Sequence, residues 1–132
     1  MTNLNSVVLI GRVTAEITER DFAYLSTGTA KLSFSVAVNE SRQVNGQWQD
    51  EPNFFKIVQF GKMAESLKDK LHKGSKIAIS GKLKQNRWKA QDGSNRSEVF
   101  VLAMGIEFLD APKQNNQNGN QNYQNGDSEL WT

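Results

Sequence analysis

The sequence of 132 residues contains no cysteine, a single histidine and only two prolines. Without cysteine, the chain can form neither a disulfide framework nor a thiolate metal site or nucleophile. Its carboxylates do not cluster with the spacing of metal ligands, which a metal-dependent nuclease would need. The lone histidine, His72, follows a predicted helix and is interpreted as a helix-end surface residue. We therefore expect a protein that is not an enzyme and that holds no cofactor and no metal.

Long apolar runs are also lacking. No run approaches the length that spans a membrane, and the first residues lack the basic and then apolar pattern of a secretory signal. We therefore expect a soluble, cytoplasmic protein with no membrane partner. Apolar residues make up 37% of the chain, which is below the usual share for a globular protein and indicates that part of the chain does not fold.

The C-terminal part of the sequence is the part that we expect to remain disordered. Ten of the fourteen residues in 113–126 are Asn or Gln, and two more are Gly. The last six residues, 127–132, are acidic and then apolar. We therefore divide the chain into a folded domain (1–112), a disordered linker (113–126) and an acidic-hydrophobic C-terminal tip (127–132).

The charge is small in total but unevenly distributed along the sequence. Residues 1–55 carry four basic and six acidic groups, residues 56–96 carry eleven and three, and residues 97–132 carry one and five. A dense basic block between acidic ends favours a polyanionic partner. The alternative is a solvated lysine-rich surface, which is common in small domains.

Hydrophobic periodicity predicts five strands and one helix. Alternating or β-branched patterns indicate strands at 4–14, 29–39, 54–60, 76–88 and 97–109. A helical stripe over 63–71 falls between the third and fourth strands, and Gly74 is well placed to end that helix. This order is that of a five-stranded OB-fold barrel. Gly11 predicts a bend that lets the first strand serve both sides of the barrel, and 40–53 is interpreted as a polar loop that turns at Asn45-Gly46.

The third strand carries the clearest functional signal. If side chains alternate, one face presents Phe54, Lys56, Val58 and Phe60, whereas the other, core-facing side presents Phe55, Ile57 and Gln59. An exposed aromatic ring can stack on a nucleobase, and a neighbouring ammonium group can bind a phosphate. The alternative is a strand buried on both faces, with the lysine reaching out to water.

Other residues of the predicted barrel support the nucleic-acid interpretation. OB-folds bind oligonucleotides with the face of strands 2 and 3 and with the loops that follow strands 1 and 4. Trp88 falls in the last predicted hairpin, and the same predicted surface gathers basic residues: Lys56, Lys82, Lys84, Arg87 and Lys89. Lys62, which follows the third strand, is a further candidate DNA contact. The residues alone do not distinguish DNA from RNA, because stacking and phosphate contacts are indifferent to the 2′-hydroxyl. An OB-fold module that binds RNA or protein therefore remains the alternative.

Several sequence segments, in order, resemble the bacterial-type single-stranded DNA-binding protein family, which is bacterial or phage-encoded. They are NSVVLIGR at 5–12, YLSTG at 24–28, FSVAVN at 34–39, FFKIVQFGKMAE at 54–65, KGSKIAISGKL at 73–83, RW at 87–88, DG at 92–93 and EV at 98–99. This resemblance covers nearly all of residues 3–110. It implies an OB-fold homotetramer that binds and protects single-stranded DNA, independently of sequence, during replication, recombination and repair.

The resemblance also implies roles for particular residues. In this family, aromatic residues that stack on DNA occupy the positions of Phe54, Phe60 and Trp88. A further stacking tryptophan of some members is replaced near Arg42, and Trp48 is a candidate substitute for it. Such a protein would be nucleoid-associated in the cytoplasm, or in the host cytoplasm if phage-encoded.

The family also recruits replication and repair proteins through its C-terminal tip. Here the corresponding partner-binding residues are Asp127, Glu129, Leu130 and Trp131. The tip lacks the acidic run and the final Pro-Phe of the family pattern, so we expect weaker recruitment or a dedicated partner.

Overall fold

The computed structural model describes residues 2–109, which are mainly β-structure. The elements in chain order are β1 (Val7–Val13), the 3₁₀ turn η1 (Glu19–Asp21), β2 (Phe22–Tyr24), β3 (Ala30–Val44), β4 (Gln47–Phe60), α1 (Lys62–Leu67), β5 (Lys76–Lys89) and β6 (Asn95–Phe108). The five predicted strands and the helix are present in the predicted order. The short β2 is an addition. The predicted linker and tip lie outside the described residues.

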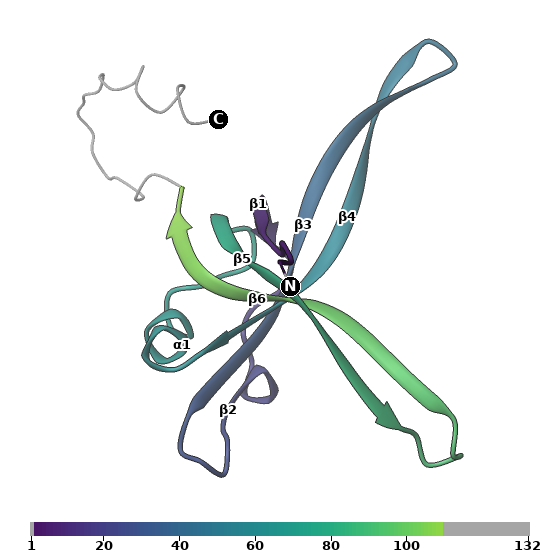
Figure 1. The fold of residues 1–132 in the computed structure, drawn as a ribbon. Helices are drawn as coiled ribbons and strands as arrows, with labels where there is room; N and C mark the ends of the chain where they lie inside the picture. Colours follow the sequence, from purple (N-terminus) through teal and green to yellow (C-terminus); the bar gives the residue numbers. More distant parts are fainter. Residues whose placement is uncertain (1, 110–132) are drawn as a thin grey trace, which may run out of the picture.

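Five strands close into a barrel (Figure 1). Going round it, β1 pairs with β5, β5 with β6, β6 with β4, β4 with β3, and β3 again with β1. All of these pairings are antiparallel except that of β4 with β6, which is parallel at Ile57 and Val58. With α1 between the third and fourth barrel strands, the structure confirms the predicted OB-fold barrel.

Two glycines allow the strands to approach closely enough to close the barrel. β1 pairs with β5 as far as Arg12 and with β3 from Arg12 onward, so one strand serves both sides as predicted. A Cβ at Gly11 would lie 2.6 Å from the carbonyl oxygen of Ala37, so only glycine fits there. A Cβ at Gly81 would likewise collide with the carbonyl oxygen of Leu102.

A β-bulge in β6 lies opposite Gly81. The register moves between the pair Ser80–Gly105 and the pair Gly81–Ala103, which leaves Met104 as the extra residue. Because of this extra residue, the inward positions of β6 change from odd to even numbers past the bulge. Gly105, which pairs with Ser80, directly follows the extra residue of this bulge.

The core fills the barrel interior and is capped by α1. Its fully buried members come from alternate positions of the strands and from the helix region, and they include Leu32, Val36, Ile57, Leu71, Ile77, Ile79 and Val101. Gln59, predicted on the core face of β4, is also buried. The strand periodicity thus correctly placed Ile57 and Gln59 of β4 in the core.

The helix is shorter than the predicted stripe, and its predicted end is wrong. α1 ends at Leu67, and the N–H of Lys70 bonds the Leu67 carbonyl at 2.9 Å in a tighter turn. This turn carries Leu71 into the core, where it is 1% exposed. Gly74 then adopts a φ of 91° and donates its N–H to the Val13 carbonyl at 2.8 Å. The apolar spacing arises from this turn and not from a longer helix.

The predicted polar loop over 40–53 is instead a two-stranded arm. β3 and β4 stay paired from Lys31 and Phe60 at the barrel to Val44 and Gln47 at the tip. Positive φ angles at Asn45 and Gly46 confirm the predicted turn. Figure 1 shows this arm and a second one, formed by β5 and β6, leaving the barrel in different directions.

Candidate nucleic-acid interface

The outward face of β4 carries the predicted aromatic platform. Phe54 is 64% exposed and Phe60 is 37% exposed, with Lys56 between them on the same face. Val58 shares this face but is buried, so the platform is not continuous. Phe55, on the predicted core face, is 39% exposed because β4 leaves the barrel there. The structure thus presents two rings to solvent, with the partly exposed Lys56 side chain between them.

The β5–β6 arm contributes a third ring and most of the remaining basic residues. Trp88 is 46% exposed and lies opposite Arg96 in the arm. Strand alternation places Lys82 and Lys84 on the same face as Trp88. The same alternation places Arg87 and Lys89 on the opposite face of β5, so the expectation of a single basic surface holds only in part. A shallow hollow of about 460 Å³ near the arm tip is lined by Gln85, Arg87, Trp88, Lys89, Asn95, Arg96 and Ser97.

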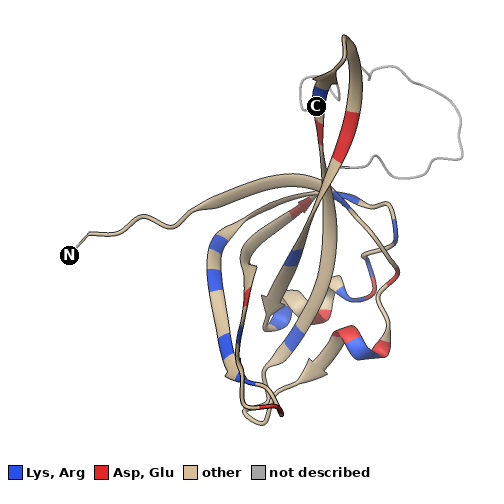
Figure 2. Ribbon diagram, turned by 90° about the vertical axis from the view of Figure 1, so that its right-hand side faces the viewer, with Lys and Arg blue, Asp and Glu red and all other residues tan. Residues whose placement is uncertain are grey.

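The β3–β4 arm is more acidic than the rest of the candidate interface. Figure 2 shows acidic positions on this arm, at the top of the view, and most basic positions below it. Arg42 forms an ion pair with Glu51, with Nη1 3.3 Å from Oε1. Trp48 is 70% exposed but lies opposite Gln43, on the other face of the arm from Arg42. The structure therefore does not bring these two predicted stacking residues together, although both remain on the surface.

The predicted basic residue Lys62 is separate from both arms. It is the first residue of α1, is exposed, and follows Phe60 by two positions. It therefore lies at the barrel end of the platform. This position suits a contact with the backbone of a strand that continues past Phe60.

An ion pair joins the platform to the β5–β6 arm. Both carboxylate oxygens of Glu98 lie 3.2 Å from Lys56 Nζ. The two side chains are partly exposed, at 40% for the lysine and 37% for the glutamate. Sequence reasoning missed this contact, because the partners are separated by 42 residues and no local pattern links them.

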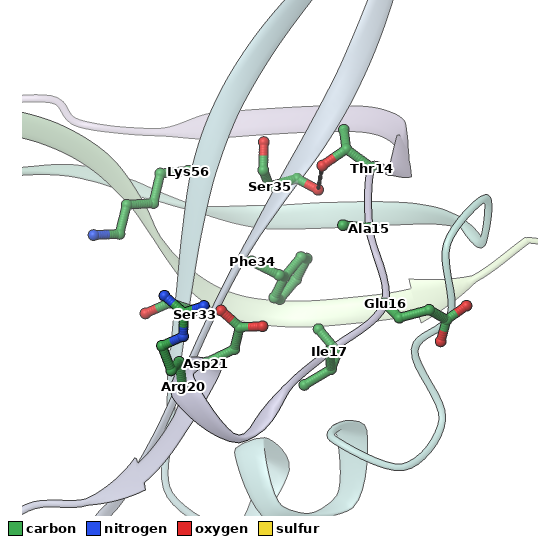
Figure 3. A pocket seen from close by; sticks show the side chains of 10 residues that line it. All are labelled: Thr14, Ala15, Glu16, Ile17, Arg20, Asp21, Ser33, Phe34, Ser35 and Lys56. Carbon is green, nitrogen blue, oxygen red and sulfur yellow. Dashed lines mark hydrogen bonds between the residues drawn. The ribbon is translucent and has the colours of Figure 1, made fainter.

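A hollow of about 520 Å³ borders the platform beside Lys56 (Figure 3). It lies between the connection after β1 and the middle of β3, and it is lined by Thr14, Ala15, Glu16, Ile17, Arg20, Asp21, Ser33, Phe34, Ser35 and Lys56. The Lys56 side chain extends away from the loop residues in this view. The sequence predicted a strand over 29–39 but gave no signal for the hollow.

The connection after β1 is anchored by Glu16. Its Oε2 accepts the backbone N–H of Lys73 at 3.0 Å, and its Oε1 lies 3.2 Å from His72 Nδ1. The backbone hydrogen bond, together with the His72 contact, lowers the pKa of Glu16. His72 is exposed, as expected, but its role is to fix this connection. On the other side, Tyr24 donates to Glu65 at 3.0 Å, and this bond raises the pKa of Tyr24.

Two classes of site are not found in the described part of the chain. Within residues 2–109, no three or more His, Asp or Glu side chains are grouped to hold a metal ion. None of the helices in that range has the length and apolar character needed to cross a membrane.

A closed five-stranded barrel with this helix position and an outward aromatic and basic face defines an OB-fold of the oligonucleotide-binding class. Comparison with known sequences is more specific. The chain belongs to the single-strand binding protein family, whose model matches residues 4–109.

The relatives are single-stranded DNA-binding proteins by name. The chain is 39% identical over 109 residues to the single-stranded DNA-binding protein of Treponema pallidum, covering 83% of this chain and 60% of that protein. It is 36% identical over 124 residues to single-stranded DNA-binding protein 2 of Chlorobaculum tepidum, covering 93% and 82%. The chain thus spans less than two thirds of the Treponema protein and most of the Chlorobaculum protein.

Solved structures give the same fold. A deletion mutant of the single-stranded DNA-binding protein from Thermus aquaticus matches with a TM-score of 0.70 and 32% identity, covering 83% of this chain and 52% of that one. The Plasmodium falciparum SSB in complex with ssDNA matches with a TM-score of 0.71 and 27% identity, covering 83% and 98%.

Proposed function

We propose that this protein binds single-stranded DNA independently of sequence and protects it during replication, recombination and repair. The observation that carries the proposal is the outward face of β4, where two exposed rings flank a lysine. Family membership and the names of the relatives support it.

The mechanism follows from the chemistry of this face. Unpaired bases stack on Phe54, Phe60 and Trp88, and every base offers a π-face, so stacking requires no particular sequence. Phosphates are drawn to Lys62, Lys82 and Lys84, and Arg87 and Lys89 extend the basic surface round the arm. Binding of a phosphate releases condensed counterions from the DNA.

The β3–β4 arm extends the proposed site by stacking and not by charge. Trp48 offers an exposed ring near the arm tip, whereas the Arg42 guanidinium is already paired with Glu51. We therefore assign the base contact on this arm to Trp48 and a secondary role to Arg42.

The functional unit that we propose is a homotetramer in the cytoplasm. In the single chain, large apolar side chains outside the platform are exposed on β1, β5 and β6, namely Val8, Ile10, Leu83, Val99 and Met104. Exposed apolar surface of this kind favours contact with further copies. Sedimentation equilibrium tests this, and a monomer at micromolar concentration contradicts it.

Recruitment of replication and repair proteins is assigned to the C-terminal tip. Leu130 and Trp131 would fill an apolar pocket of the partner, while Asp127 and Glu129 would meet basic groups around it. A pull-down that compares the full chain with Trp131→Ala tests this assignment. Identical partner sets would contradict it.

The experiment that tests DNA binding is a competition titration. Labelled oligo-dT bound to the full-length protein is displaced with unlabelled oligo-dT, oligo-U or duplex DNA of equal length at fixed salt. We expect displacement in the order oligo-dT, oligo-U, duplex. Stronger displacement by oligo-U would make the protein an RNA-binding module, and no binding of oligo-dT would contradict the proposed function.

A further inference from the structure

The ion pair between Lys56 and Glu98 lies at the centre of the candidate interface. Lys56 stands between Phe54 and Phe60 on β4, and Glu98 reaches it from β6, with both oxygens 3.2 Å from Nζ. β4 and β6 pair only at residues 57–58 and 101–102. Because the two arms diverge from this point (Figure 1), the ion pair bridges their bases.

A carboxylate in this place is unexpected for a surface that binds a polyanion. If phosphate binding alone had shaped the platform, the central lysine would be free and no carboxylate would face it. Instead, Glu98 neutralises the ammonium group and adds a charge that repels an approaching phosphate. A nucleobase carries no net charge, so it can stack on the flanking rings without displacing the carboxylate.

The cations at the edges of the platform have a different environment. Among residues 2–109, no carboxylate forms an ion pair with Lys62, Lys82 or Lys84. Lys82 and Lys84 lie on β5, opposite Leu102 and Phe100 of β6. The interface is therefore neutralised at Lys56, between Phe54 and Phe60, whereas positive charge remains on β5 and at the start of α1. This arrangement favours a strand whose bases face the barrel and whose phosphates face outward.

We propose that Glu98 determines the preference for unpaired strands: by neutralising Lys56, it makes the centre of the platform select bases and disfavour phosphates. The inference rests on the proposed function and adds a specificity-determining residue to it. A duplex keeps its base faces stacked inside and a polyphosphate has none, so both meet the platform chiefly through phosphate oxygens, and a free central lysine would bind these competitors better. A strand with unpaired bases depends on the rings and gains less from that lysine.

The test compares Glu98→Gln, Lys56→Gln and the double variant in the full-length protein. Affinities for oligo-dT, for a blunt duplex of equal length and for inorganic polyphosphate are measured across a range of salt concentrations. In Glu98→Gln we expect affinity for duplex and polyphosphate to rise at least about threefold more than affinity for oligo-dT. The salt slope for duplex should steepen by about 0.9, which is one additional phosphate neutralised. In the double variant, which has no free central cation, the preference should return to within about twofold of the parent.

A matched control is Glu107→Gln, which removes an exposed carboxylate from the same strand, opposite Ala78. An equal change of preference in Glu107→Gln would overturn the proposal, because net charge alone would explain it. The proposal would also be overturned if the double variant showed the same change of preference as Glu98→Gln, because the effect of the carboxylate would then not depend on Lys56. If the parent fails to bind oligo-dT, the proposed function fails. If the parent binds and Glu98→Gln leaves the preference unchanged, only the role of Glu98 fails.

Discussion

The side-chain amide of Asn5 continues the β1–β5 ladder by bonding both backbone groups of Leu83. Leu83 N–H donates to Asn5 Oδ1 at 2.8 Å, and Asn5 Nδ2 donates to the Leu83 carbonyl at 2.9 Å. Backbone pairing of the two strands begins only at Val7 and Gly81. A side chain thus takes the place of the next backbone partner and ties the start of β1 to β5.

We expect Asn5→Ala to lower the free energy of unfolding by about 0.5–2 kcal/mol, because two exposed hydrogen bonds are lost. Asn5→Asp keeps the acceptor for Leu83 N–H but removes the donor, so its free energy of unfolding should lie between those of the parent and Asn5→Ala. Urea unfolding at fixed protein concentration measures the change, since assembly makes stability concentration-dependent. A stability equal to that of the parent would show that water replaces the amide at no cost.

Loss of a stacking ring should weaken DNA binding. We expect Trp88→Ala or Phe54→Ala to weaken binding to oligo-dT by about 1–3 kcal/mol for each lost stack. Fluorescence anisotropy at fixed salt measures this. The control is Tyr24→Ala, an aromatic residue that is 58% exposed and paired with core-facing Ala30, off the platform. If Trp88→Ala binds as the parent does, Trp88 is not part of the site.

The salt dependence of binding should separate the edge lysines from the central one. Each phosphate neutralised on a single strand contributes about −0.7 to the slope of log affinity against log salt. Replacing Lys82 and Lys84 together by Gln should flatten the slope by up to about 1.4 on this scale. Lys56→Gln should change it less, because Glu98 already neutralises that lysine. A larger effect from Lys56 than from the edge pair would place the DNA backbone across the platform centre.

Stability in acid should depend on Glu16. Its pKa is lowered below the ordinary value of 4.5, chiefly by the hydrogen bond from the Lys73 backbone and next by His72. A lowered folded-state pKa means that the stabilisation is fully present above 4.5 and is lost as the pH falls through the folded-state value. We expect the unfolding free energy of Glu16→Gln to fall less steeply below pH 4.5 than that of the parent. The control is Glu19→Gln, which removes another exposed carboxylate nearby and should keep the acid profile of the parent. An unchanged acid profile would contradict this role.

Alternation within the barrel strands was readable from the sequence because one face of each strand meets the core. It predicted that Ile57 and Gln59 are buried and that Phe54 and Phe60 face outward. It was wrong for Val58, which is buried, and for Phe55, which is exposed where β4 leaves the barrel. The same signal failed for the arm over 40–53, because both of its faces meet water and no apolar alternation marks it. β2 has only three residues, which is too few for any period to show.

The sequence predicted which residue types make up the site but not which of them contact each other. The rings and cations follow from strand alternation and resemblance, whereas the Lys56–Glu98 pair depends on how β4 and β6 meet across the barrel. The sequence also grouped Arg87 and Lys89 with Trp88, and alternation in β5 separates them. This second error could have been avoided from local alternation, whereas the Lys56–Glu98 contact depends on tertiary structure that no local pattern specifies.

The double pairing of β1 has a consequence for how the molecule folds. Each arm is a hairpin whose tip pairs residues close in sequence, such as Val44 with Gln47, so each can form early. β1 must instead pair with strands that are distant in sequence, Val7 with Gly81 and Arg12 with Ala37. Closing such long loops costs more chain entropy. We expect pulsed hydrogen exchange during refolding to protect amides of the arms first and those of β1 last. The ring of strands would thus be closed last by the strand that comes first in chain order among the described residues.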